Sequence, residues 1–125
     1  MSRRMQKQFT ITELENRWRN ALELTRYAVA QHPAYYRELK RLVHDILDNP
    51  LDINAYLPTA EKLMNLLKLL DPEGRGSIFY LFYDRFAPAK IWQVSLFRVE
   101  CRDLLAYLNV FDDWRRQSNH LSVVK

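Results

Sequence analysis

Residues 87–116 read APAKIWQVSLFRVECRDLLAYLNVFDDWRR, and this stretch decides the fold of the chain. Pro88 fits the first turn of a helix, where its fixed φ and its missing N–H cost nothing. Apolar side chains then recur every three or four residues, which predicts one buried stripe along a long helix. The stripe consists of Val94, Phe97, Cys101, Leu104, Leu105, Leu108 and Phe111.

The opposite side of the same helix carries a second apolar stripe, interrupted by Asp103. Its members are Trp92, Leu96, Val99, Ala106, Val110 and Trp114. A helix that is apolar on two sides needs two partners. Either it is the central strut of a bundle, covered by other helices all round, or its second stripe meets another chain.

A first helix is expected near the N-terminus. Thr10 and Thr12 each precede a Glu by three residues, which is the spacing of a capping box. The helix is therefore predicted to begin near one of these two residues and to run to about Gln31.

A second helix should begin at Pro33 and end near Leu47. Tyr35 is predicted to face inward, with Tyr36 at the edge of the apolar stripe. The other side of this helix carries the most concentrated basic surface of the chain, which consists of Arg37, Lys40, Arg41 and His44.

Further helices are predicted on both sides of a Gly-containing loop. Residues 52–57 fit a short helical turn before Pro58, and residues 59–70 fit a longer helix. Residues 78–86 suit either a helix or a strand, but no second convincing strand exists to pair with them. Because isolated strands are unstable, a helix is expected there.

The loop that begins at Asp71 shares part of the spacing of an EF-hand. Arg75 and Phe82 stand at positions where calcium needs oxygen ligands, so we do not expect a calcium site. The alternative is a helix end with Gly in the left-handed conformation, followed by Ser77 as the cap of the next helix.

The sequence therefore predicts an all-α, single-domain bundle of about five helices, with the long C-terminal helix as its central strut. Only 2 Gly and 5 Pro among 125 residues agree with a helical chain. The predicted divisions are a mobile basic N-terminal tail at residues 1–8, the bundle at residues 9–117 and a polar C-terminal tail at residues 118–125.

The chain shows no pattern typical of an enzyme. His32, His44 and His120 are scattered singly, and Cys101 lies on the buried stripe, so neither a metal site nor a disulfide is expected. No phosphate-binding loop, dinucleotide fingerprint or nucleophile motif occurs. We expect no enzyme activity, no cofactor and no small-molecule substrate.

The preferred hypothesis is a non-enzymatic protein-interaction module, such as an adaptor, an inhibitor or a self-assembling subunit. It would use the second stripe to bind a protein partner or another copy of itself, as a homo-oligomer. Since aromatic anchors dominate many interfaces, the predicted interface residues are Trp92, Leu96, Val99, Val110 and Trp114.

The alternative is a small basic accessory subunit that binds nucleic acid. The net charge of +4 permits phosphate contacts without base readout. The predicted phosphate-binding residues are Arg17, Arg37, Lys40, Arg41, Arg115 and Arg116. With neither a signal peptide nor a membrane span in the sequence, we expect a cytoplasmic protein that does not bind membranes.

Overall fold

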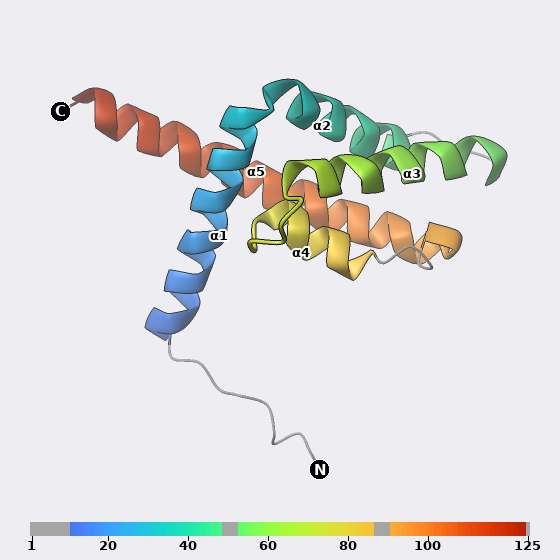
Figure 1. The fold of residues 1–125 in the computed structure, drawn as a ribbon, viewed down its shortest axis with the longest axis horizontal. Helices are drawn as coiled ribbons and strands as arrows, with labels where there is room; N and C mark the ends of the chain where they lie inside the picture. The colour runs from blue at the N-terminus through green and yellow to red at the C-terminus, as the bar shows by residue number, and fades with distance from the viewer. Residues whose placement is uncertain (1–10, 49–52, 87–90, 125) are drawn as a thin grey trace, which may run out of the picture.

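The computed structural model describes residues 11–48, 53–86 and 91–124, with the side chains of residues 16–48, 53–86 and 91–117. The described residues form five helices and no strand (Figure 1). The helices are α1 (Ile11–Gln31), α2 (Pro33–Asp48), α3 (Ile53–Leu70), α4 (Ile78–Arg85) and α5 (Val94–Val124).

The bundle is arranged along α5, which is its longest helix (Figure 1). α2 and α3 lie side by side, and α4 packs against both α3 and α5. α1 crosses α5 steeply and also contacts α2 and α4. The prediction of an all-α bundle with a long C-terminal helix is confirmed.

The core is built around the first stripe of α5. Phe97, Cys101, Leu104, Leu108 and Phe111 are each at most 1% exposed, as the helical spacing predicts. The other helices supply the residues that cover this stripe. Fully buried examples are Leu39 and Ile46 from α2, Leu63 and Leu67 from α3, and Ile78 and Phe79 from α4.

The first turn of α5 lies later than predicted. The helix begins at Val94, and Ile91 and Trp92 form a short turn before it; residues 87–90, where the sequence predicts the start, lie outside the described residues. The carbonyl oxygen of Ile91 accepts a hydrogen bond from the Tyr56 hydroxyl at 2.9 Å, so it is engaged by α3. At its other end α5 continues through residues 118–124, which belong to the predicted polar tail at residues 118–125.

The prediction that Pro58 separates a short turn from the next helix is wrong, because α3 runs without interruption from Ile53 to Leu70. Pro58 is the sixth residue of α3, so its missing N–H removes only one bond, to the carbonyl of Asn54 near the helix start. One residue later, the Thr59 hydroxyl donates to the carbonyl oxygen of Ala55 at 3.3 Å.

The loop between α3 and α4 is held by Asp71. This buried carboxylate accepts hydrogen bonds from the backbone N–H groups of Arg75 (2.9 Å) and Ser77 (3.1 Å) and from the Ser77 hydroxyl (2.7 Å). Gly74 and Gly76 have φ values of 65° and 105°. The Ser77 hydroxyl also accepts from the N–H of Tyr80, so the predicted cap is confirmed, and so is the helix predicted at residues 78–86, which the structure ends at Arg85.

Candidate protein-interaction surface

The second apolar stripe of α5 is exposed in the isolated chain. Leu96, Val99 and Val110 are 47%, 47% and 49% exposed, and Trp92, just before the helix, is 65% exposed. Ala106 lies on the same side and is also exposed. The alternative in which other helices cover α5 all round is therefore wrong. We call Leu96, Val99, Asp103, Ala106 and Val110 the outer face of α5.

Apolar exposure is concentrated around this face. Ten large hydrophobic side chains of the described residues are exposed, and five of them lie between Trp92 and Val110. The fifth is Tyr107, at the border of the face, where its ring packs edge-on against Trp18 of α1 and Phe82 of α4, with centroids 5.3 and 5.4 Å away. Single exposed apolar residues are ordinary, but several of them in a row on one helix, here interrupted only by Asp103, are typical of a binding surface.

Trp114, the fifth predicted interface residue, does not lie with the others. It is only partly exposed, and its ring lies 6.2 Å from that of Phe111. The guanidinium of Arg26 lies over the Trp114 ring at 5.0 Å. Trp114 is thus engaged where α1 crosses α5, and the exposed row ends at Val110.

The two edges of the outer face differ in charge. On one edge, Arg85 of α4 forms ion pairs with Glu100 and with Asp103, the latter at 3.2 Å. On the other edge, Arg102 is exposed and makes no ion pair within the described residues. A partner of this face therefore meets a free guanidinium on one side and a carboxylate-rich cluster on the other.

Four of the six predicted phosphate-binding residues are already paired with carboxylates. Arg41 bonds Glu38 and, at 2.8 Å, Asp45 on the same helix. The hydrogen bond between Arg41 and Glu38 lowers the pKa of the exposed Glu38 carboxyl and raises the pKa of Arg41. Arg116 is paired with Asp113.

The other two paired cations meet at one buried carboxylate, Asp112. Lys40 lies 2.8 Å from Asp112 and Arg115 lies 3.4 Å from it. The sequence gives no sign of this cluster, because Asp112 lies more than 70 positions from Lys40 in the chain. Of the two remaining candidates, Arg37 is exposed on α2, and Arg17 lines a hollow with Trp18 and Leu81. Only Lys40 and Arg115 are brought together by the fold.

Tyr36 completes the Asp112 cluster, and this corrects the prediction for the start of α2. The Tyr36 hydroxyl donates to Asp112 at 2.9 Å, and its ring packs edge-on against Phe79 and Phe111. Tyr36 is 2% exposed, whereas Tyr35, predicted to face inward, is 38% exposed and stacks on His32. Burial, reinforced by the adjacent carboxylate, raises the pKa of Tyr36 well above its usual range.

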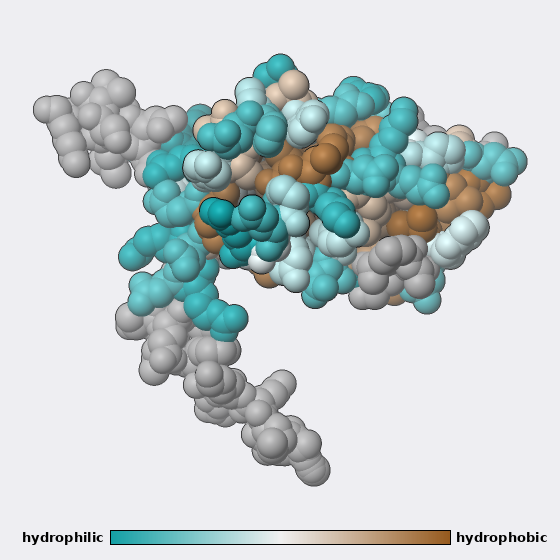
Figure 2. Space-filling view, viewed as in Figure 1, coloured by the Kyte–Doolittle hydropathy of each residue, from teal (hydrophilic) through white to brown (hydrophobic). Residues whose placement is uncertain are grey.

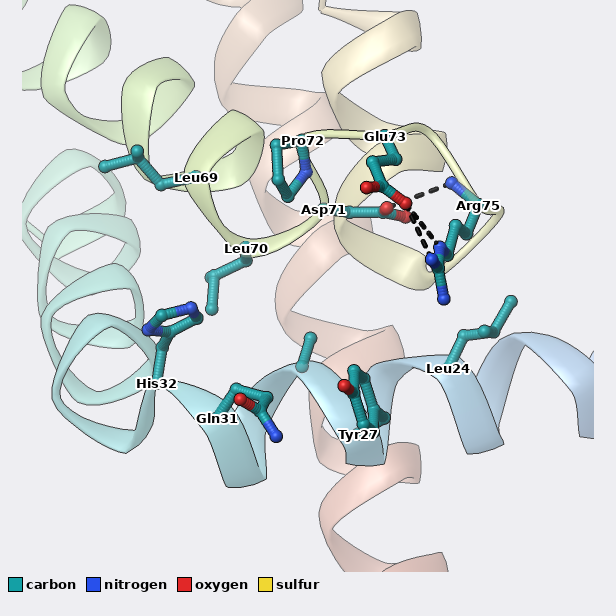
Figure 3. Close-up of a pocket in the computed structure, with 11 residues that line it drawn as sticks. Leu24, Tyr27, Gln31, His32, Leu69, Leu70, Asp71, Pro72, Glu73 and Arg75 are labelled. Atoms are coloured by element: carbon teal, nitrogen blue, oxygen red, sulfur yellow. Dashed lines mark hydrogen bonds and ion pairs between the residues drawn. The ribbon is translucent and has the colours of Figure 1, made fainter.

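A separate hollow of about 230 Å³ lies between the end of α1 and the loop after α3 (Figure 3). Tyr27 of α1, His32 between α1 and α2, and Leu69 of α3 line it. Of its charged groups, Glu73 and Arg75 are paired with each other at 2.7 Å, and the Asp71 carboxylate accepts a hydrogen bond from the Arg75 N–H. No Ser, Thr or Cys is among the lining residues, and the one side-chain hydroxyl there belongs to Tyr27.

The described residues contain neither a metal-binding cluster nor a membrane-spanning helix. No three His, Cys, Asp or Glu side chains there are grouped so that they could share a metal ion. Nor is any helix there both long enough and apolar enough to cross a membrane. On the face shown in Figure 2, hydrophobic surface is also visible along α3, but in patches broken by polar groups.

Comparison of the chain with protein-family models, with curated proteins and with solved structures finds no match.

Proposed function

We propose that this protein is a non-enzymatic interaction module that binds a protein partner through the outer face of α5. One observation carries the proposal: a row of apolar side chains stands exposed on a helix whose opposite side forms the core. Removing apolar surface from water stabilises a complex by about 25 cal/mol per Å² before the costs of association are subtracted. Trp92 would supply the aromatic anchor at one end of the row.

The nucleic-acid alternative has less support. Binding to phosphates gains most of its free energy from unpaired cations that release counterions. Lys40, Arg41, Arg115 and Arg116 instead carry carboxylate partners on the chain itself. A phosphate would have to compete with each of these carboxylates.

Site-specific photocrosslinking tests the proposal in the cells that make the protein. A photoreactive amino acid placed at Val99 should yield a defined protein adduct, because this side chain lies in the middle of the row. The matched control places the same group at Lys62, an exposed residue of α3. Adding Leu96→Asp should abolish the adduct from position 99 while leaving the helix content unchanged.

The outcome against the proposal is an adduct pattern that is the same from positions 99 and 62. The nucleic-acid alternative is tested on purified protein by light scattering at low and high salt, with and without a short duplex. If the protein binds the duplex only at low salt, and if this binding is unchanged by Leu96→Asp, the phosphate-binding hypothesis would be favoured instead.

A further inference from the structure

The outer face of α5 has the spacing of a coiled-coil seam. Its five residues, from Leu96 to Val110, follow one another at intervals of three, four, three and four. This alternation keeps a row of side chains facing one partner helix, and each side chain then enters a hole formed by four residues of that partner. The partner that the spacing fits is therefore a helix.

The charges beside the seam are complementary to those of a second copy. Arg102 lies on one edge, Glu100 lies on the opposite edge, and Asp103 occupies the middle of the seam. When two identical helices pair in parallel, opposite edges meet, and Asp103 of each copy enters the hole that Val99, Arg102, Asp103 and Ala106 of the other copy form. Each Asp103 carboxylate then lies opposite the other Asp103 and beside the Arg102 guanidinium of the other chain, so that two carboxylates and two guanidiniums form a charge-balanced cluster.

An antiparallel pair would place the charges badly. In that arrangement equal edges meet, so the Arg102 guanidiniums of the two copies would lie on the same side of the seam. Like charges in such positions weaken an interface and help to exclude a wrong partner or orientation. The small side chain of Ala106 leaves room for two helices to approach in either orientation. The charges therefore decide which orientation is favoured.

We propose that the outer face of α5 binds a second copy of this chain, with the two α5 helices parallel and in register. This inference rests on the proposed function and names its partner. The seam is short and includes a charge, so the pair is weak and forms reversibly. Its contacts are Leu96, Val99, Ala106 and Val110 with their counterparts, and Arg102 with Asp103 of the second copy.

Disulfide crosslinking tests the orientation. In the parallel pair the two positions 110 are adjacent, whereas in an antiparallel pair centred on the seam they lie more than about 20 Å apart. The native Cys101 is buried and does not interfere. Under mild oxidation, Val110→Cys should form covalent dimers roughly tenfold faster or more than Lys62→Cys, which measures random collisions.

Equal rates for these two variants would overturn the parallel pairing. So would a mixed disulfide between Leu96→Cys and Val110→Cys chains in place of the disulfide between two Val110→Cys chains, because only an antiparallel pair brings those two positions together.

Charge reversal tests the Arg102–Asp103 contact. Arg102→Asp and Asp103→Arg each place like charges across the seam, so each variant alone should associate roughly tenfold more weakly or worse, as measured by sedimentation equilibrium. An equimolar mixture should regain dimers, because both contacts are then restored between the two kinds of chain. Both side chains are exposed, so circular dichroism should show an unchanged fold. A mixture that stays as monomeric as its components would overturn the contact.

The failure of self-pairing can be distinguished from the failure of the proposed function. If the wild-type chain stays monomeric over a hundredfold range of concentration while position 99 crosslinks to a different protein in cells, self-pairing is overturned and the interaction module stands. If neither association nor a specific adduct is found, both are overturned.

Discussion

Asp112 is a buried carboxylate that contacts one hydroxyl and two cationic side chains. Its carboxylate lies within hydrogen-bond distance of the Tyr36 hydroxyl and Lys40, with Arg115 at 3.4 Å. Removing one member of such a cluster leaves the others buried without compensation. Asp112→Asn should therefore lower the free energy of unfolding by about 1–3 kcal/mol, measured by urea denaturation.

The matched control for this substitution is Asp113→Asn, at the neighbouring position. The Asp113 side chain is 63% exposed, and among the described residues it is paired only with the exposed Arg116. Its replacement should change the stability by less than about 0.5 kcal/mol. Equal effects of the two substitutions would mean that the buried cluster contributes nothing to the free energy of unfolding.

The two buried tyrosines, Tyr36 and Tyr56, should make the free energy of unfolding depend on pH in the alkaline range. Burial raises the pKa of both hydroxyls above the usual value, so the folded chain keeps these protons where the unfolded chain loses them. Their contribution is fully present below about pH 10 and declines as the pH rises further. The phenolate absorbance of these two residues should therefore appear only together with the loss of helix.

Tyr36→Phe provides the check, since it should remove about half of the phenolate signal that accompanies alkaline unfolding. A signal of undiminished size would show that Tyr36 ionises in the folded state.

Sequence periodicity favoured Tyr35 over Tyr36 as the inward-facing residue, and this prediction is wrong. Both lie close to the apolar stripe of α2, and only the position of α5 decides which one is buried. The same holds for Asp112, whose partners Tyr36 and Lys40 lie more than 70 positions away in the chain. Contacts between distant segments leave no periodic signal, and these residues were therefore missed.

At the scale of the helices, the cap of α4 is the contact most easily tested. The Ser77 hydroxyl donates to Asp71 and accepts from the N–H of Tyr80, and the residue is 1% exposed. Ser77→Ala removes both bonds and should cost about 1–2 kcal/mol of unfolding free energy. Ser95→Ala, at an exposed position of α5, is the control and should be nearly neutral.

The existence of the helices was easier to predict than their ends. The helix at residues 78–85 follows from the Ser77 cap and from the lack of a strand to pair with, and the structure confirms it. Pro58 was read as a helix stop, yet near an N-terminus it removes only one hydrogen bond. The start of α5 could not be predicted, because the Tyr56–Ile91 bond that accompanies it joins two distant segments.

At the scale of the whole molecule, self-pairing predicts that thermal stability depends on concentration. Because the second copy binds the folded chain, association stabilises it by mass action. A tenfold increase in protein concentration should raise the unfolding midpoint by about 2 °C once dimers predominate. Val99→Asp lies outside the core and should abolish this dependence without lowering the midpoint at high dilution.

The sequence indicated the candidate surface but could not decide whether it was covered. Two apolar stripes on one helix are compatible with a buried strut and with an interface, and only the packing of α1, α2 and α4 on one side of α5 separates them. For the basic residues, the sequence suggested a surface that the fold does not leave free. Their spacing suggested a phosphate-binding face, whereas Lys40, Arg41 and Arg115 lie against carboxylates that the folded chain brings close.

Cys101 gives the chain a built-in reporter of transient opening. It is the only cysteine, it is fully buried on the core side of α5, and burial raises its thiol pKa to about 12. A thiol reagent reacts with the thiolate and must first reach it, so the folded chain should be labelled about a thousandfold more slowly than the unfolded chain, or slower still. With reagent in excess, the labelling kinetics measure how often α5 separates from the helices that cover it.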